Sequence, residues 1–289
     1  MKKTLVASLC GLLLSGCIAS GPKPLPILNP FLQSLETKIN YDNSNTKVLE
    51  SEIELALRST YEVKISSEFQ ITIGEIVINS NMETSSTATP IWEKDNFIYF
   101  LTAMHVVSDK SIPLTQEYTD LIEAESKRLN EKPEIKATIK ILMYSPYLDK
   151  EFEANDSYYE PLCKLGVIRM PSNEYVKPIP FKIDKNSSMH IGDYVYNLGY
   201  PVCLQAVTPS MNSGHIVSIK PLLPSLYPNY IIDNHINPGD SGGPVYALKN
   251  GHLTLVGVME EITGTTLTTY GVFNPLLTLD ALLEFSSKP

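Results

Sequence analysis

The sequence predicts an all-β fold, either a β-sandwich or a pair of small barrels. From Tyr61 onward the chain consists of short runs rich in β-branched and aromatic residues, separated by Gly, Pro and Asn. Many short strands divided by turn residues are typical of sandwiches and barrels. The expected strands read VKIS, ITIGEIVINS, FIYFLTA, ATIKILMY, LGVIRM, YVYNLGY, HIVSI, LTLVGVM and TTYGVF.

The size and charge of the chain indicate a globular protein that does not bind nucleic acid. With 289 residues, 43% of them hydrophobic, the chain is long enough to bury a sizeable core in one large or two modest domains. The formal net charge is -9, and we find no basic patch or stripe. This charge argues against a nucleic-acid-binding protein, which needs such a patch to contact phosphates.

Residues 1–16 are predicted to be a signal peptide of the lipoprotein type. Lys2 and Lys3 precede an apolar run from Leu5 to Leu14, which is too short to span a bilayer as a mature helix. The run ends in LSGC, residues 14–17, which resembles the lipobox of bacterial lipoproteins, where the cysteine is diacylated and becomes the new N-terminus. An ordinary signal peptide with a chance cysteine is the alternative. Lipidation of Cys17 would anchor the protein in the bacterial cell envelope, with the periplasmic face of the outer membrane favoured.

The segments that follow the leader are expected to be a tether and a helix. Residues 17–30 contain four prolines and one glycine, which is typical of an extended tether between the lipid and the folded body. Residues 31–60 are predicted to be a helical extension, and residues 61–289 the main domain. The apolar positions of the helix, which follow a 3.6-residue period, are Val48, Leu49, Ile53, Ala56 and Leu57.

Two further helices are expected among the strands. One covers residues 115–130 and ends before Pro133, and the other closes the chain at residues 275–286. Their apolar faces are Tyr118, Leu121, Ile122 and Leu129 in the first, and Leu276, Leu277, Leu279, Leu282 and Leu283 in the second.

Cys163 and Cys203 remain after the leader is removed, and export places them in an oxidising compartment. A disulfide between them and two separate buried thiols are both compatible with the sequence, because spacing alone does not bring two cysteines within bonding distance.

The stretch INPGDSGGPV, residues 236–245, contains the candidate nucleophile. Three glycines and a proline surround Ser241 in its GDSGGP core, so the backbone bends sharply here. Acyl-transfer hydrolysis needs a nucleophile, a base, and donors aimed at the developing oxyanion. Ser241 supplies the hydroxyl, and the backbone N–H groups of Gly239 and Ser241 are the expected oxyanion donors. A structural turn with one serine is the alternative.

The candidate base is His105, in LTAMHVV at the end of an apolar strand. A lone histidine at such a place is usually a core residue. However, histidine followed much later by serine, each at a strand edge, is one of the known chain orders of a serine triad.

Together the two blocks resemble those of the chymotrypsin-like serine proteases, particularly the bacterial trypsin-like group that includes the high-temperature-requirement periplasmic proteases. TAMHVV resembles the histidine block of that family and NPGDSGGPV its serine block, and the resemblance extends from about residue 62 to 286. It implies two six-stranded antiparallel β-barrels with the site between them, a C-terminal helix and one inserted helix. It also implies that peptide bonds are cleaved through an acyl-enzyme. The other similar segments are NLGYP (197–201), NSGHIVSI (212–219), LVGV (255–258) and the closing strand and helix (270–283).

The chain departs from the family at the third triad residue. The family has an aspartate at the head of a strand that here reads KLGVIR, so Lys164 stands in the place of the carboxylate. A positive charge beside His105 would oppose formation of the imidazolium. Loss of this aspartate alone lowers turnover about 10⁴-fold in serine proteases.

Three carboxylates are candidates to replace the missing aspartate. Glu260 aligns with a position whose small hydroxyl side chain in the family touches that aspartate, so it is the first candidate. Asp156 is the second and Glu160 the third, both in the segment before Lys164. The alternative is that all three are solvated surface acids.

The other polar residues near the predicted site have expected roles that are structural or undecided. Asp240 is expected to orient the serine turn, with a catalytic role as the alternative. His235 aligns with the specificity pocket, either as a selective residue or as part of the wall. No metal is expected, because His190, His215 and His252 lack metal-ligand spacing with Cys or carboxylates.

These observations predict a lipid-anchored serine endopeptidase with a protein or peptide substrate and no cofactor. The alternative is a pseudoprotease that retains the fold and binds a peptide or an envelope partner. Lys164 favours the binder, whereas the intact His105 and serine blocks favour the enzyme.

Overall fold

The structure is a computed structural model that describes residues 43–108, 116–186, 189–202, 208–221, 228–234, 236–265 and 268–288. The predicted leader, the tether and Cys17 lie outside these residues, as do Cys203 and His235. No helix of the described part is long and apolar enough to cross a membrane.

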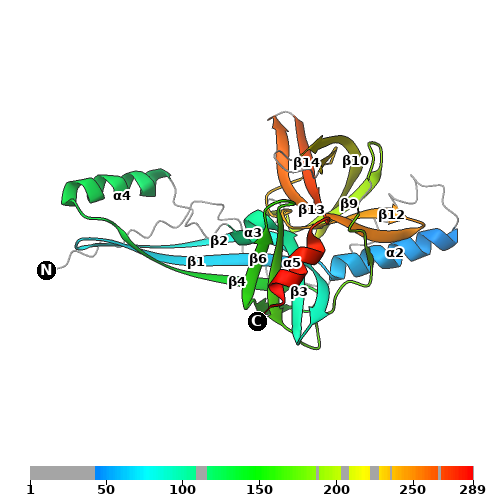
Figure 1. The fold of residues 1–289 in the computed structure, drawn as a ribbon, viewed down its shortest axis with the longest axis horizontal. Coiled ribbons are helices and arrows are strands. Elements are labelled where there is room, and N and C mark those ends of the chain that lie inside the picture. Colours follow the sequence, from blue (N-terminus) through cyan, green and yellow to red (C-terminus); the bar gives the residue numbers. More distant parts are fainter. Residues whose placement is uncertain are drawn as a thin grey trace, which may run out of the picture.

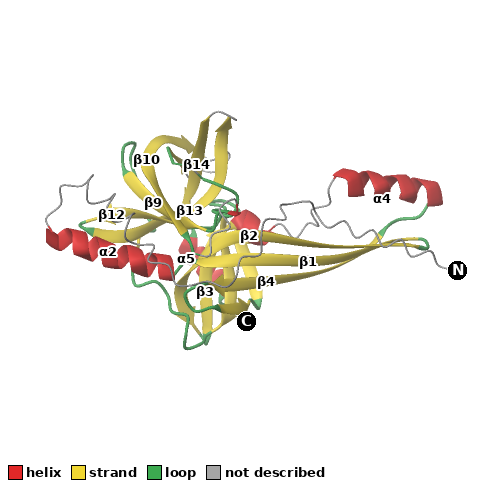
Figure 2. Cartoon of the chain, turned by 180° about the vertical axis from the view of Figure 1, so that it is seen from behind, coloured by secondary structure: helices red, strands yellow, loops and turns green. Residues whose placement is uncertain are grey.

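The chain folds mostly into antiparallel strands, as predicted (Figure 2). The helices are α2 (Asn43–Arg58), α3 (Met104–Ser108), α4 (Gln116–Leu129) and α5 (Leu279–Ser286). The strands of the first half are β1 (Tyr61–Ile73), β2 (Ile76–Lys94), β3 (Phe97–Ala103), β4 (Glu134–Ser145), β5 (Lys150–Glu153), β6 (Asp156–Glu160) and β7 (Leu165–Pro171). Those of the second half are β8 (Lys182–Ile183), β9 (Tyr194–Gly199), β10 (Ser210–Pro221), β11 (Pro228–Ile232), β12 (Pro244–Lys249), β13 (His252–Thr265) and β14 (Thr268–Pro275).

The two halves form separate sheets that pack against each other. The first has the strand order β5-β4-β1-β2-β3-β7-β6, and the second the order β12-β9-β10-β11-β14-β13-β8. In the second sheet β12 also pairs with β13, which closes six strands into a barrel. The first sheet is a half-barrel, because β5 and β6 have no pairing with each other among the described strands. The trypsin-like fold class is thus confirmed, but the closed first barrel is not observed.

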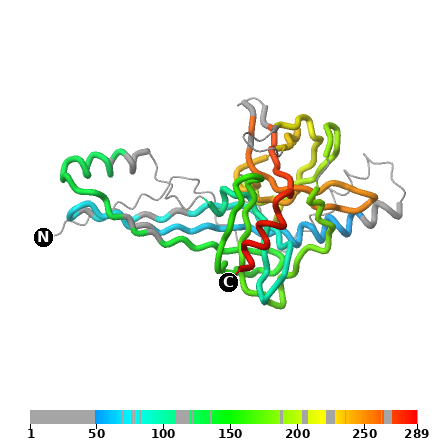
Figure 3. The backbone as a smooth tube through the Cα atoms, in the orientation of Figure 1, coloured from blue at the N-terminus to red at the C-terminus, as the bar shows by residue number. Residues whose placement is uncertain are grey.

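Three strands of the first sheet extend beyond the body as an arm, consisting of β1, β2 and β4 (Figures 1 and 3). β1 and β2 pair without interruption from Tyr61↔Ala88 to Ile73↔Ile76, and β1 also pairs with β4. The predicted helix at residues 115–130 is confirmed as α4, which packs on β1 at the far end of the arm. Ile122 of α4 is buried there, as are Ile71 and Ile73 of β1.

The buried apolar residues form two hydrophobic cores. The larger spans the junction of the halves and includes residues of both, among them Phe100, Leu101, Val167 and Leu198. The smaller fills the closed barrel, with Val195, Ile232, Val256 and Phe273 among its members.

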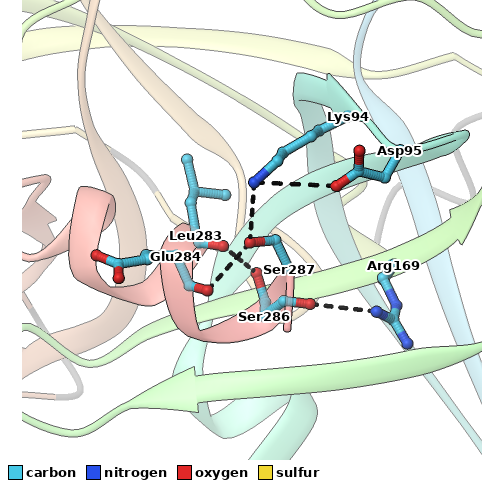
Figure 4. Close-up of polar contacts among 7 residues, drawn as sticks. All are labelled: Lys94, Asp95, Arg169, Leu283, Glu284, Ser286 and Ser287. Carbon is cyan, nitrogen blue, oxygen red and sulfur yellow. Dashed lines mark hydrogen bonds and ion pairs between the residues drawn. The ribbon is translucent and has the colours of Figure 1, made fainter. Parts of the chain in front are cut away.

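The first and last helices cover the junction of the two halves. In α2 the predicted apolar positions Leu49, Ile53 and Ala56 are buried, and in α5 Leu279, Leu282 and Leu283 are buried. Although α5 follows the closed barrel in sequence, its end is attached to the first sheet (Figure 4). The Arg169 guanidinium of β7 donates to the Ser286 carbonyl at 3.3 Å, and Lys94 Nζ of β2 donates to Ser287 Oγ at 3.4 Å.

Cys163 is a buried free thiol in the structure. Burial raises its pKa, which keeps the thiol protonated and unreactive. Of the two interpretations left open by the sequence, Cys163 therefore fits that of a small buried residue.

Candidate active site

The serine turn lies between the two sheets, and its glycines are required by that position. Gly239 has φ +101°, and a Cβ atom there would lie 2.0 Å from the Tyr200 carbonyl oxygen of the second sheet. Gly242 has φ +83°, and a Cβ atom there would lie 2.1 Å from Thr87 O and from Thr102 Oγ1 of the first sheet. Only glycine fits these two positions, because the backbone is left-handed and the space is occupied.

The hydrogen bonds of the turn leave two backbone N–H groups available. Asp240 N donates to Asn237 O, Gly242 N to Met259 O, and Gly243 N to Asp240 O, at 2.8 to 3.0 Å. Among the described residues, no hydrogen bond uses the N–H of Gly239 or of Ser241. These are the two donors that the sequence predicts for the oxyanion.

The carbonyls of the same two peptide groups are hydrogen-bonded within the protein. Pro238 O, in the peptide that carries the Gly239 N–H, accepts from Val202 N at 2.8 Å. Asp240 O, in the peptide that carries the Ser241 N–H, accepts from Gly243 N at 2.9 Å. Because the C=O and N–H of a trans peptide point in opposite directions, anchoring each carbonyl directs its N–H away from the anchoring group. Fixed donors of this kind are what an oxyanion site requires.

His105 lies on α3, directly after β3, and its side chain is 43% exposed. The position of Gly242 against Thr102 and the Ala103 backbone N brings the serine turn next to the histidine block. The Ser241 hydroxyl itself donates to the Glu260 carbonyl at 3.2 Å. Among the described residues, no hydrogen bond joins this hydroxyl to His105, so Ser241 is held by one weak hydrogen bond to the backbone of β13.

Glu260 lies at a β-bulge of β13. The pairing of β13 with β14 is regular up to Met259 and resumes at Glu261, so Glu260 is an extra residue in β13. A bulge interrupts the alternation of strand side chains, and here both Met259 and Glu260 are buried, at 0% and 4% exposure. Residues 253–259 of the same strand are buried as well, so both faces of β13 are covered along this stretch.

The Glu260 carboxylate contacts three side chains, and each of its two oxygens has at least one polar partner. Oε1 lies 3.5 Å from His105 Nδ1 and 3.6 Å from Lys164 Nζ. Oε2 accepts a hydrogen bond from Asn274 Nδ2 at 3.1 Å, and Asn274 is fully buried. Glu260 thus occupies the space between the histidine and the lysine.

Lys164 precedes β7 in a left-handed conformation, with φ +52°. Its carbonyl accepts from Met104 N at 2.8 Å, which ties it to the helix that carries His105. Its ammonium group, on a side chain 27% exposed, points to Glu260 and balances the buried carboxylate. The lysine at the place of the family's aspartate therefore pairs with an acid supplied by another strand.

The model of the trypsin-like peptidase domain matches residues 89–258, more than half of the chain. This chain belongs to the trypsin-like peptidase family. The match includes the histidine and serine blocks and ends two residues before Glu260. No curated protein matches the chain.

Solved structures of the family have the same fold. Two structures of the HtrA-type protease AlgW with a decapeptide, one of them a point variant, are similar to this chain with a TM-score of 0.55 each. The identity is 15% over 81% of this chain, so the likeness shows the fold alone. The aligned part covers 64% and 66% of those chains, just under two thirds of their length.

The other two acids proposed for this trypsin-like peptidase lie elsewhere. Asp156 pairs with Arg169 on the outer strands β6 and β7. Glu160 accepts from the backbone N of Leu162 and Cys163 and from the Thr278 hydroxyl. Both are fixed by partners other than His105, so Glu260 is the one candidate of the three that the structure places beside the histidine.

Asp240 is fully buried beneath the serine turn. Oδ2 accepts from Asn237 N at 2.9 Å, whereas Oδ1 is buried with no hydrogen-bond partner among the described residues. The first contact fixes the turn, as expected of a structural residue. Burial raises the pKa of Asp240 to about 6.

This pKa predicts a specific pH dependence of stability. The folded state binds the proton of Asp240 more tightly than the unfolded state, where the pKa of this carboxyl is 3.8. Ionisation of Asp240 therefore lowers the free energy of unfolding as pH rises from about 4 through 6. In Asp240→Asn this loss is absent. The difference in unfolding free energy, variant minus wild type, should rise by up to about 3 kcal/mol between pH 4 and pH 7 in urea titrations. Asp95→Asn, at an exposed position, is the control, and a difference independent of pH would contradict the assignment.

The remaining described histidines are exposed and pair with acids other than Glu260. His190, His215 and His252 lie near Asp193, Asp233 and Glu52 respectively. No group of three or more metal-ligating side chains occurs among the described residues. His235 lies outside them, so its role in the specificity pocket stays a prediction.

Two polar residues of the site were not predicted from the sequence. Asn274 contacts Glu260, and Thr87 contacts the serine turn through its backbone and its hydroxyl. Neither belongs to a recognisable block: Asn274 reaches Glu260 across the β13–β14 hairpin, and Thr87 reaches the serine turn from a strand remote in sequence.

Proposed function

We propose that this trypsin-like peptidase is an active serine endopeptidase in which Glu260 replaces the missing aspartate as the third catalytic residue. The observation that carries the proposal is the position of the Glu260 carboxylate, which is 4% exposed and 3.5 Å from His105 Nδ1. A carboxylate at this nitrogen favours the tautomer with the proton on Nδ1 and leaves Nε2 free to accept the serine proton.

In the proposed mechanism Ser241 is the nucleophile and His105 acts first as a base and then as an acid. His105 Nε2 takes the proton as Ser241 Oγ attacks the peptide carbonyl, and the N–H groups of Gly239 and Ser241 bind the resulting oxyanion. The imidazolium, stabilised by Glu260, then protonates the leaving amine, and an acyl-enzyme remains. Water deprotonated by His105 attacks the ester, and Ser241 recovers its proton as the acid product leaves.

Lys164 has two opposed effects in this mechanism. It shares Oε1 of Glu260 with His105, so it weakens the stabilisation of the imidazolium. It also neutralises a carboxylate that is almost fully buried and would otherwise lack a permanent cation. We therefore expect a functional enzyme that is slower than one with the family's usual triad.

An extended peptide is the substrate that the surroundings of Ser241 favour. Beyond Met259, β13 pairs with β14 on one side and has no described strand on the other. This free edge begins at the Glu260 carbonyl, which the Ser241 hydroxyl contacts at 3.2 Å. A peptide added as a strand there would pass its scissile bond over the nucleophile. The decapeptide of the similar AlgW structures supports a peptide ligand.

Labelling with a fluorophosphonate probe tests the proposal. The purified protein should take up the probe covalently, and Ser241→Ala should abolish the uptake because the phosphonyl group bonds to Oγ. Ser210→Ala, at a partly buried serine on β10, is the control and should label normally. Absence of uptake in a folded wild-type protein would reject the enzyme and favour the peptide-binding alternative.

We propose further that the enzyme is anchored in the outer membrane through diacylated Cys17 and faces the periplasm. The basis is the leader and the LSGC sequence, followed by a proline-rich tether. In a bacterial host, wild type should fractionate with membranes and incorporate labelled palmitate, whereas Cys17→Ser should do neither. Incorporation of palmitate by Cys17→Ser would contradict the proposal.

A further inference from the structure

Thr87 lies on β2 where the arm joins the body, and it is fully buried. On the far side of this residue, β2 runs out along β1 as part of the arm. On the near side, from Thr89, β2 pairs with β3. Between these two parts the outer edge of β2 meets the serine turn, since Thr87 N donates to Ser241 O at 2.8 Å.

The Thr87 side chain makes two further bonds to the same region. Its hydroxyl donates to the Gly239 carbonyl at 2.7 Å and accepts from Tyr200 N at 3.0 Å. Its own carbonyl accepts from Thr102 Oγ1 at 2.8 Å, which is on the strand that leads to His105. One threonine thus connects the serine turn, the second sheet and the histidine strand.

These bonds hold the peptide groups that alternate with the oxyanion donors. The peptides bearing the Gly239 and Ser241 N–H groups are anchored through Pro238 O and Asp240 O, as described above. The peptide between them and the peptide that follows present the carbonyls of Gly239 and Ser241, and both carbonyls accept from Thr87. All four successive peptide planes are therefore fixed, and Thr87 fixes two of them.

We infer that Thr87 is a positioning residue of the oxyanion hole, and this inference rests on the proposed function. Gly239 has no side chain to restrict its dihedral angles, so the bond from the Thr87 hydroxyl to its carbonyl limits rotation of the neighbouring donor peptide. Without that hydroxyl, the buried Gly239 carbonyl and the buried Tyr200 N–H lose their hydrogen-bond partner. The serine turn is then expected to shift so that these buried groups can form other hydrogen bonds.

A second threonine of β2 provides a matched control. Thr89 is also fully buried, and its hydroxyl donates to Ser59 O at 2.9 Å, away from the serine turn. Replacing either residue by Val removes one buried hydroxyl at nearly constant volume. If each hydroxyl only stabilises the fold, reactivity toward an active-site probe should fall in both variants. If the Thr87 hydroxyl positions the oxyanion donors, reactivity should fall in the Thr87 variant alone.

The experiment measures inactivation by a fluorophosphonate probe, whose phosphoryl oxygen takes the place of the oxyanion. Its maximal rate constant, kinact, depends on the hole, whereas its half-saturation concentration, KI, reports binding. In Thr87→Val we expect kinact to fall about 10- to 100-fold with KI changed less than about threefold, because complete loss of one oxyanion donor costs about 10²- to 10³-fold. Thr87→Ser should restore kinact to within about threefold, and Thr89→Val should leave it unchanged. Thermal unfolding is followed for every variant.

Each other outcome overturns the inference. The inference is wrong if folded Thr87→Val retains the wild-type kinact, or if Thr87→Ser is as slow as Thr87→Val. It is also wrong if kinact falls in Thr89→Val by as much as in Thr87→Val. Should Thr87→Val not fold, Thr87→Ala is compared with Thr87→Ser at equal folded fraction, and equal kinact values would then overturn it. A wild-type protein that does not label at all would instead reject the proposed function, so the two failures are distinguishable.

Discussion

Replacing Glu260 with Gln should lower kcat/KM for a fluorescent casein substrate by about 10³- to 10⁴-fold while the protein remains folded. Gln retains the shape of Glu and its capacity to contact Asn274, but it lacks the charge that stabilises the His105 imidazolium and fixes its tautomer. Loss of the triad carboxylate has an effect of this size in other serine proteases. Lys164 would then face a neutral amide, and its uncompensated charge would disfavour the imidazolium further.

Asp156→Asn is the control for this prediction. Asp156 pairs with Arg169 at the surface, and removing its charge should change kcat/KM by less than about twofold. Equal effects of the two substitutions, or no effect of Glu260→Gln, would show that Glu260 is not the third catalytic residue.

Restoring the family's aspartate alone should damage the enzyme further. In Lys164→Asp the new carboxylate would face Glu260, whose Oε1 lies 3.6 Å from Lys164 Nζ in the wild type. Two carboxylates this close share a proton or move apart, so neither holds His105 properly. We expect kcat/KM to fall on the order of 10²-fold below wild type, a part of the loss caused by removing the triad acid.

The double variant Lys164→Asp with Glu260→Ser should recover activity relative to Lys164→Asp. It restores both the aspartate and the small hydroxyl residue that the family has at these two positions. We expect kcat/KM at least about 10-fold above that of the single variant, as coupled sites in contact commonly interact by 0.5 to 3 kcal/mol. Lys164→Asn controls for the backbone, because Asn and Asp both tolerate the left-handed φ of +52° at this position. Additive losses in the double variant would contradict an exchange of roles between the two positions.

The part of the site that the sequence predicts is the part encoded in contiguous residues. The serine turn is specified within a few positions, since Gly239 and Gly242 are required by the very shape that exposes Ser241 and its N–H groups. Glu260 was identified through its alignment with the family. Its burial, however, depends on the packing of both faces of β13, which the sequence of this strand does not reveal.

What the sequence does not predict depends on pairing between distant strands. Thr87 contacts Gly239 across 152 positions and Tyr200 across 113, and no local pattern encodes either contact. The arm was missed for the same reason, because VKIS and ITIGEIVINS are typical of ordinary short strands. Their length as a paired ribbon follows only from the register that joins β1 to both β2 and β4.

The route of β2 gives the molecule an unusual mechanical property. A single strand begins at the tip of the arm, at Ile76, and continues to Thr87, which is bonded to the carbonyls of Gly239 and Ser241. No loop intervenes to absorb a displacement, and a paired strand is stiff along its length. The far end of the arm in Figure 1 is therefore joined to the serine turn by one continuous strand and by the hydrogen bonds of Thr87, so a displacement of the ribbon has a direct path to the turn that carries Ser241.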